Sequence, residues 1–287
     1  MSGLISVIVT TYNREDALEA VLRSLGSQSD RNFEIVVADD GSAPATAALV
    51  EQRKAQVGVR LTHVWHEHRG FRAGEIRNRA VRASRGDYIV FLDGDCLTRP
   101  DFVATHRRLA EPGWFVTGNR ALLTQALTDA VLSQPLELER WGTADWLWQR
   151  LSGGLNRLAP VLRLPLGPLR KMRPQAWEGA RSCNLGVWRA DLDRVDGFDA
   201  SFSGWGKEDS DLLVRLLHAG VRRKDGAYAT GVLHLWHAAA DRSRLAENEQ
   251  RLSRVIETRS VRAEAGLSSL EHDVSLPITG PGKMGAR

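Results

Sequence analysis

The sequence predicts an α/β fold built on one mostly parallel β-sheet with helices on both of its faces. Two observations predict it. Four short apolar runs rich in β-branched residues lie within the first 95 residues, and segments with helical spacing separate them. Strands that alternate with helices form βαβ units, which assemble into a twisted parallel sheet. A chain of 287 residues can bury the core that such a sheet requires.

The predicted elements follow one another in a regular order. We expect strands over residues 4–9, 33–38, 60–65 and 88–92, because each is a short apolar run. Helices are expected over residues 15–25, between the second and third strands, and over about 73–84. The first helix places Ala17, Val21, Leu22 and Leu25 at helical spacing, and Asn13 is its predicted N-cap.

Composition narrows the class of protein. Hydrophobic residues make up 43% of the chain and charged residues 26%, which is typical of a globular domain and not of a disordered chain. The net charge is +4, and most cations are arginines. Arginine suits diphosphates or anionic lipid headgroups, although a GC-rich genome would also favour its codons. Basic and acidic residues are interspersed, which argues against a nucleic-acid partner.

No stretch reaches the roughly 18 apolar residues that a membrane span needs, and the first residues lack a signal pattern. We therefore expect a cytoplasmic protein. The two cysteines, Cys96 and Cys183, cannot form a disulfide framework, and neither belongs to a zinc-type CxxC.

Residues 122–181 have irregular spacing and several tryptophans, and leucines alternate with arginines over residues 149–174. Two interpretations are open. The stretch is either a basic amphipathic segment that lies on an anionic membrane face, or a mobile flap at the acceptor site whose leucines pack on the domain. After Leu267 the chain is rich in Ser, Gly and Pro, and we expect a loose tail.

The first candidate site is Asp93-Gly94-Asp95, directly after the fourth predicted strand. In an open α/β sheet, ligands bind at the carboxyl ends of the strands. Two carboxylates one residue apart can converge on a hard cation such as Mg²⁺ or Mn²⁺, which would stabilise a departing diphosphate. Asp-Gly-Asp also makes a good turn, so the motif alone is a weak signal.

The second candidate site is the run from Gly204 to Asp211. Gly206 lets the backbone approach a ligand closely, and Trp205 offers an apolar face to a sugar ring. Glu208 and Asp209 open a helix, where a carboxylate can act as a general base. The alternative is that these carboxylates only complement the helix N-terminus.

The third candidate site is His234-Leu235-Trp236-His237, on or just beyond a strand expected to start near Ala227. Mn²⁺ accepts an imidazole beside carboxylates, so His234 and His237 are candidate metal ligands. The alternative is two ordinary histidines at the end of a strand.

Taken in order, these segments resemble a known family. Residues 9–14, 38–42, 77–79 and 91–95 are similar to the inverting glycosyltransferase family 2, whose catalytic domain has the GT-A fold. That fold is a Rossmann-like, mostly parallel sheet with an elaborated C-terminal acceptor half. Residues 184–189, 197–199 and 204–211 resemble the galactosyltransferase-type C-terminal region of β-1,4-galactosyltransferases and bacterial chondroitin polymerase.

The resemblance implies a role for each matching residue. Thr10, Tyr12 and Asn13 line the nucleoside site, Asp40 bonds a uracil, Arg77 faces the diphosphate, and Asp93 contacts the ribose or donor. Asp95 binds the metal, and His234 or His237, or both, complete its ligands where galactosyltransferases have Met and His. Trp205, Gly206 and Glu208 hold the acceptor, and Asp209 is the base.

The expected reaction moves a sugar from a UDP-sugar to a hydroxyl of a glycan or glycolipid with inversion and with Mn²⁺ or Mg²⁺, in bacterial surface polysaccharide or lipopolysaccharide synthesis. The alternatives are a non-catalytic sugar-nucleotide or glycan-binding module and a nucleotidyltransferase. The expected parts are a nucleotide-sugar half (1–120), a Trp-rich basic insertion or flap (121–180), an acceptor half that completes the metal site (181–265) and a flexible tail (266–287). The expected location is the cytoplasm, with peripheral contact at the inner face of the cell membrane as an option.

Overall fold

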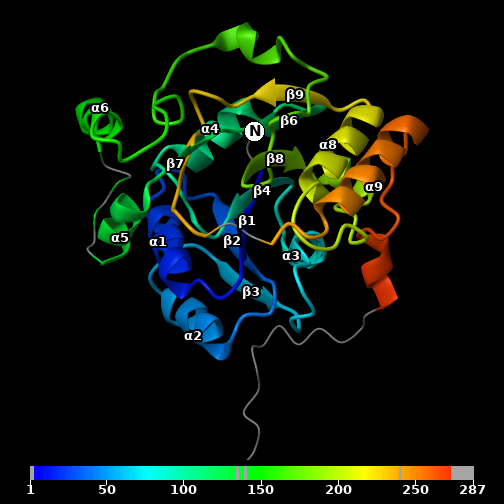
Figure 1. Cartoon of the computed structure of the whole chain (residues 1–287), viewed down its shortest axis with the longest axis horizontal. Helices are drawn as coiled ribbons and strands as arrows, with labels where there is room; N and C mark the ends of the chain where they lie inside the picture. The colour runs from blue at the N-terminus through cyan, green and yellow to red at the C-terminus, as the bar shows by residue number, and fades with distance from the viewer. Residues whose placement is uncertain (1–2, 134–135, 137, 139–140, 239–240, 273–287) are drawn as a thin grey trace, which may run out of the picture.

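The computed structural model describes residues 3–133, 136, 138, 141–238 and 241–272. A seven-stranded sheet forms its centre (Figure 1). The strand order is β3 (Leu61–Trp65), β2 (Phe33–Asp39), β1 (Ile5–Thr11), β4 (Tyr88–Asp93), β8 (Asn184–Trp188), β6 (Trp114–Thr117) and β9 (Arg222–Asp225). The first four strands in this order are parallel, whereas β8 runs antiparallel to both of its neighbours.

Helices cover both faces of the sheet, because side chains alternate along each buried strand. On β1, Ile5, Val7 and Val9 pack in one core with α1, whereas Ile8 packs in the other with α3. The first face carries α1 (Glu15–Gly26), α2 (Pro44–Arg53) and α4 (Phe102–Leu109). The second carries α3 (Ala73–Ala83), α7 (Arg189–Val195) and α8 (Glu208–His218), with α9 (Leu245–Thr258) packed outside α8 (Figure 1).

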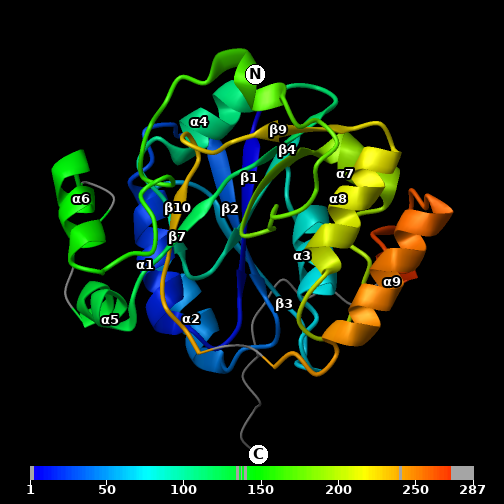
Figure 2. The same cartoon turned by 45° about the horizontal axis from the view of Figure 1, so that its top comes forward.

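A second, three-stranded sheet brings distant segments together. Its order is β5 (Cys96–Leu97), β10 (Val232–His234) and β7 (Arg120–Leu122), and β10 lies beside β7 in Figure 2. The amide of Leu235 donates to the carbonyl of Asp95 at 2.9 Å. This sheet therefore places the C-terminal histidines next to the turn that follows β4.

The middle of the chain contributes α5 (Gln125–Ser133), α6 (Thr143–Leu151) and a 3₁₀ turn over Gly167–Lys171. In both views α5 lies beside α1, and α6 lies farther out. Leu155 and Val161 are buried in the core. Arg170 is also buried, and its guanidinium donates to the carbonyls of Asp225 and Ala227. Leu155 and Val161 of this stretch thus pack on the domain, whereas Leu151, Leu164 and Leu169 are exposed, so both interpretations stay open.

The predicted strands and helices of the first 95 residues are confirmed to within two residues at each end. Asn13 as the helix cap is wrong: its φ is 46°, and its side-chain oxygen accepts from the amide of Ala43 at 2.9 Å. The strand expected near Ala227 starts at Val232, because a turn with Tyr228 at φ 57° precedes it.

Of the predicted tail, Ser268–His272 form a 3₁₀ turn and Leu267 is buried, while residues 273–287 lie outside the described residues. Within the described ranges, every helix is too short or too polar to cross a membrane.

Candidate active site

The polar segments predicted to follow the strands meet at one edge of the sheet. In the parallel register Thr10 of β1 lies opposite Asp93 of β4, and Thr11 lies opposite Asp39 of β2. The amide of Gly94 donates to the carbonyl of Thr10 at 2.7 Å, and a Cβ at Gly94 would lie 2.8 Å from that oxygen. Glycine is therefore required for the 93–95 turn to fold against β1.

Arg77, on α3, joins the two halves of this edge. Its Nε donates to Thr10 Oγ1 at 3.0 Å, Nη2 to Asp93 Oδ1 at 3.2 Å, and Nη1 to Glu208 Oε1 at 3.2 Å. The side chain is buried, and charged hydrogen bonds of this kind are strong where water is scarce. The run that begins at Gly204 therefore lies on the same side of the sheet as the 93–95 turn, as the predicted reaction requires.

The start of α8 presents two buried carboxylates. Burial raises the pKa of Glu208, and the charge of Asp209 adds to this, so that the pKa reaches about 7 although Arg77 opposes the shift. Asp209 Oδ1 accepts from the amide of Ser210 at 2.7 Å, and Oδ2 lies 3.9 Å from Nη1 of Arg181. Lys207 just before them has φ 76°, a costly conformation of the sort that clusters at functional sites.

Asp211, the third carboxylate of this turn, has a different role. Both Nε and Nη2 of Arg215 donate to its Oδ2, at 2.9 and 2.6 Å, and both side chains are almost fully buried. Arg215 also donates to the carbonyl of Val195. The Asp211–Arg215 pair therefore links α8 to the end of α7, which is a structural role.

Asp95 lies between the two candidate histidines. Its Oδ1 is 3.6 Å from Nε2 of His234, and its Oδ2 is 3.5 Å from Nε2 of His237. Burial lowers the pKa of His234 although the Asp95 carboxylate opposes the shift, and this favours the neutral imidazole that a metal ligand requires. One carboxylate and two imidazoles are a donor set that fits Mn²⁺.

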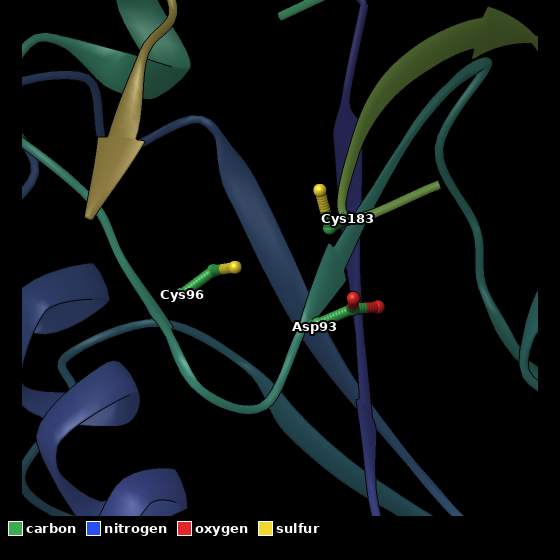
Figure 3. Close-up of side chains that lie close together, drawn as sticks. All are labelled: Asp93, Cys96 and Cys183. Carbon is green, nitrogen blue, oxygen red and sulfur yellow. The ribbon is translucent and has the colours of Figure 1, made fainter. Parts of the chain in front are cut away.

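Two cysteines lie beside this donor set. Figure 3 shows Cys96 and Cys183 approaching Asp93 from different segments of the chain, and the carboxylate and both sulfurs lie within 4.8 Å of one another. Burial raises the pKa of the Cys96 thiol well above its usual value. A neutral thiol is a poor metal ligand. The Cys96 thiol contacts Asp95 Oδ1 at 3.6 Å, and ligand atoms of Asp95, Cys96 and His234 lie within 4.8 Å of one another. Cys96 would therefore be a further ligand only as a thiolate.

The nucleoside candidates lie at the ends of β1 and β2. Tyr12 is 44% exposed, and its ring stacks on His68 with centroids 4.5 Å apart. Asp40 is buried; its Oδ1 lies 2.6 Å from His66 Nε2, and its Oδ2 accepts from the amide of Arg72 at 2.9 Å. Both oxygens of the predicted base-binding carboxylate thus have protein partners already.

On the acceptor side, the ring of Trp205 carries Arg242 at 4.8 Å from its centroid. Sequence reasoning missed Arg181 near Asp209, and Arg120, whose Nη1 lies 3.7 Å from Cys183 Sγ close to Asp93. It also missed His66 and His68. The His-x-His pattern at the end of the third strand was the available signal for these two, since polar groups at that edge contact the ligand.

Residues 6–144 match the family model for glycosyl transferase family 2, and residues 170–238 match the one described as the N-terminal domain of galactosyltransferase. The chain is 32% identical over 231 residues to validoxylamine A glucosyltransferase of Streptomyces hygroscopicus subsp. limoneus. This alignment covers 76% of this chain and 49% of that protein. It is 24% identical over 248 residues to chondroitin synthase of Escherichia coli, with 78% of this chain and 34% of that protein. The chain spans about half the length of the first relative and a third of the second.

Two solved structures share its architecture. TarS 1–349 of S. aureus in complex with UDP aligns with a TM-score of 0.58 at 17% identity, over 92% of this chain and 68% of that one. The mannosyltransferase PcManGT of Pyrobaculum calidifontis, in complex with GDP-Man and Mn²⁺, aligns with a TM-score of 0.58 at 19% identity, over 97% and 78%. These likenesses confirm the predicted GT-A fold. Residues 6–144 of the chain belong to glycosyltransferase family 2.

Proposed function

We propose that this protein is a metal-dependent, inverting glycosyltransferase that moves a sugar from a UDP-sugar to a hydroxyl of a glycan. The observation that carries the proposal is that Arg77 donates hydrogen bonds to both Asp93 and Glu208, at 3.2 Å each. Arg77 thus holds the candidate donor residues and the candidate acceptor residues at one edge of the sheet. A transferase needs that juxtaposition, because both substrates must meet within reacting distance.

The donor occupies the ends of β1, β2 and β4. Tyr12 offers its ring to the base, Asp40 bonds the base, and Thr10 and Asn13 line the nucleoside site. Arg77 supplies positive charge near the diphosphate, and Asp93 contacts the ribose or donor sugar. The glucosyltransferase relative and the UDP complex of TarS support a nucleotide-sugar donor.

Asp95, His234 and His237 would hold Mn²⁺ or Mg²⁺. Such an ion would supply positive charge for the diphosphate that leaves. The fit of the donor set and the Mn²⁺ in the PcManGT complex support this part of the proposal.

Asp209 is the general base. Trp205, Gly206 and Glu208 hold the acceptor so that its hydroxyl lies beside Asp209, which takes the proton while the oxygen attacks the anomeric carbon. The bond to the diphosphate breaks on the opposite face, so the configuration inverts. The chondroitin synthase relative supports a glycan acceptor, and we extend this to surface polysaccharide synthesis.

The test is turnover of UDP-sugars with and without MnCl₂. A transferase slowly hydrolyses its own donor when the acceptor is missing, so release of UDP from one UDP-sugar, dependent on Mn²⁺, supports the proposal. A non-catalytic binding module would bind the UDP-sugar without releasing UDP. A nucleotidyltransferase would break the phosphoanhydride bond instead, which gives UMP and a sugar 1-phosphate with water, or UTP and a sugar 1-phosphate with added pyrophosphate. Either outcome contradicts the proposal.

Membrane contact and a cytoplasmic location stay predictions. Trp148 and Leu151 on α6 are exposed, as a membrane-facing helix requires. Three cations of residues 149–174 have protein surroundings instead of facing a membrane. Arg163 pairs with Asp101, Lys171 pairs with Glu111, and Arg170 is buried. Co-sedimentation with phosphatidylglycerol vesicles, compared with phosphatidylcholine vesicles, tests this contact.

A further inference from the structure

The loop that follows β3, residues 66–72, is seated directly on the end of β2. His66 Nε2 lies 2.6 Å from Asp40 Oδ1, the amide of Arg72 donates to Asp40 Oδ2 at 2.9 Å, and His68 Nδ1 lies 3.2 Å from the Asp40 carbonyl oxygen. Gly41 has φ 91°, and a Cβ there would lie 2.4 Å from the amide nitrogen of His68. The loop thus closes over the Asp40–Gly41 turn, and glycine is required beneath it.

His66 is held from two sides. It is buried, and its Nδ1 lies 3.6 Å from Glu75 Oε1, opposite the contact of Nε2 with Asp40. Glu75 is itself held by Arg72 Nη1 at 2.7 Å and by Arg79. Burial alone would lower the pKa of His66, but the carboxylates of Asp40 and Glu75 outweigh it and raise the pKa. An imidazole fixed in this way presents one N–H to Asp40 in one direction.

The same loop adjoins the ring expected to stack on the base. His68 lies on Tyr12 with 15° between the ring planes, and the Tyr12 hydroxyl is 3.4 Å from His68 Nε2. His66 therefore contacts the Asp40 carboxylate, whereas His68 contacts the Asp40 carbonyl oxygen and the ring of Tyr12. The orientation of the Asp40 carboxylate decides which of its remaining lone pairs face the expected nucleoside site beside Tyr12.

We propose that His66 is a positioning residue for nucleobase recognition, which orients the Asp40 carboxylate so that it reads the base of the nucleotide donor. The inference rests on the proposed function, because Asp40 reads a base only if the protein binds a nucleotide sugar. His66 itself does not contact the nucleotide. It decides how well one base is distinguished from another.

A matched pair on the neighbouring residue supplies the control. His63 Nε2 lies 2.9 Å from Asp39 Oδ2, while Asp39 Oδ1 accepts from the amide of Ser42 at 2.8 Å. Asp39 is as buried as Asp40, but its carboxylate accepts from Ser42 in the turn that follows β2. Among the described residues, its hydrogen bonds do not reach the loop over residues 66–72. Replacing His63 should therefore affect stability and leave base selectivity intact.

The experiment measures dissociation constants of UDP, CDP, GDP and ADP with MnCl₂ by calorimetry. Selectivity is the ratio of the second-lowest to the lowest constant. His66→Phe keeps an aromatic ring, although a larger one, and removes the bond, and should lower this ratio about tenfold, as expected for a lost bond to a charged group. His66→Gln, which keeps a donor, should restore part of it, and His63→Phe should leave it unchanged. If His66→Phe does not fold, His66→Asn, whose amide is too short to reach Asp40, takes its place.

A double-mutant cycle decides whether His66 acts through Asp40. Asp40→Asn alone should lower the selectivity, and His66→Phe should lower it no further in that background. Equal loss of affinity for all four nucleotides, or unchanged selectivity in His66→Phe, would overturn the inference while leaving the proposed function intact. A wild-type protein that binds none of the four nucleotides and hydrolyses no UDP-sugar would overturn the proposed function itself.

Discussion

Arg77 and Glu208 are separated by 131 positions in the chain, yet Nη1 of the arginine lies 3.2 Å from Oε1 of the glutamate. The arginine comes from the region that resembles the donor half of the family, and the glutamate from the region that resembles the galactosyltransferase segment. A buried charged bond joins them. The two halves of the candidate site are thus held together by a direct contact, and the consequences can be measured.

Asp209→Asn should abolish sugar transfer and spare donor binding. The amide cannot take a proton from the acceptor hydroxyl, so the turnover number should fall by about 10² to 10⁴. The affinity for UDP, measured by calorimetry with MnCl₂, should stay at the wild-type value. A variant that transfers sugar normally but binds UDP weakly would show that Asp209 belongs to the donor site.

Asp95→Ala should remove the dependence of UDP binding on Mn²⁺. Asp95 is the carboxylate between His234 and His237, so its loss should weaken binding with MnCl₂ by at least about tenfold. Glu51→Ala is the control, because this exposed carboxylate lies on α2 and pairs with Lys54. An Asp95→Ala protein whose affinity for UDP still rises on addition of Mn²⁺ contradicts the assignment.

Glu208 should make stability depend on pH in a predictable direction. Its pKa rises on folding from 4.5 to about 7, so the folded protein holds this proton more tightly than the unfolded chain. Between these values the free energy of unfolding therefore falls as the pH rises, and the loss is complete above the folded pKa. Glu208→Gln cannot ionise, so its melting temperature relative to wild type should be higher at pH 8 than at pH 5. Equal differences at the two pH values would mean that Glu208 ionises freely.

Asp211→Asn should destabilise the fold without impairing the chemistry. It leaves the buried guanidinium of Arg215 without its counter-charge, which costs about 3 kcal/mol. Urea unfolding measures this loss, and activity should persist at low temperature. Glu247→Gln is the control, because its pair with Arg244 is exposed and should contribute little. If Asp211→Asn matched the stability of Glu247→Gln, the pair could not be what ties α8 to α7.

The sequence alone determined the parallel half of the sheet and the position of the candidate residues along it. Apolar β-branched runs form buried strands wherever helices cover both faces, so the order of elements in the first 95 residues follows from local patterning. The place of Asp93 and Asp40 at strand ends follows as well, because parallel strands end at the same edge.

Only the tertiary structure decided what each polar side chain contacts. Three carboxylates open α8, and nothing in their spacing separates Asp211, paired with Arg215, from Glu208 and Asp209. Likewise, the contact of His66 with Asp40 depends on a loop that folds back over a turn 26 positions earlier. Such contacts join residues that are distant in the chain, and they form only when packing of the core has already placed the strands and helices that carry them.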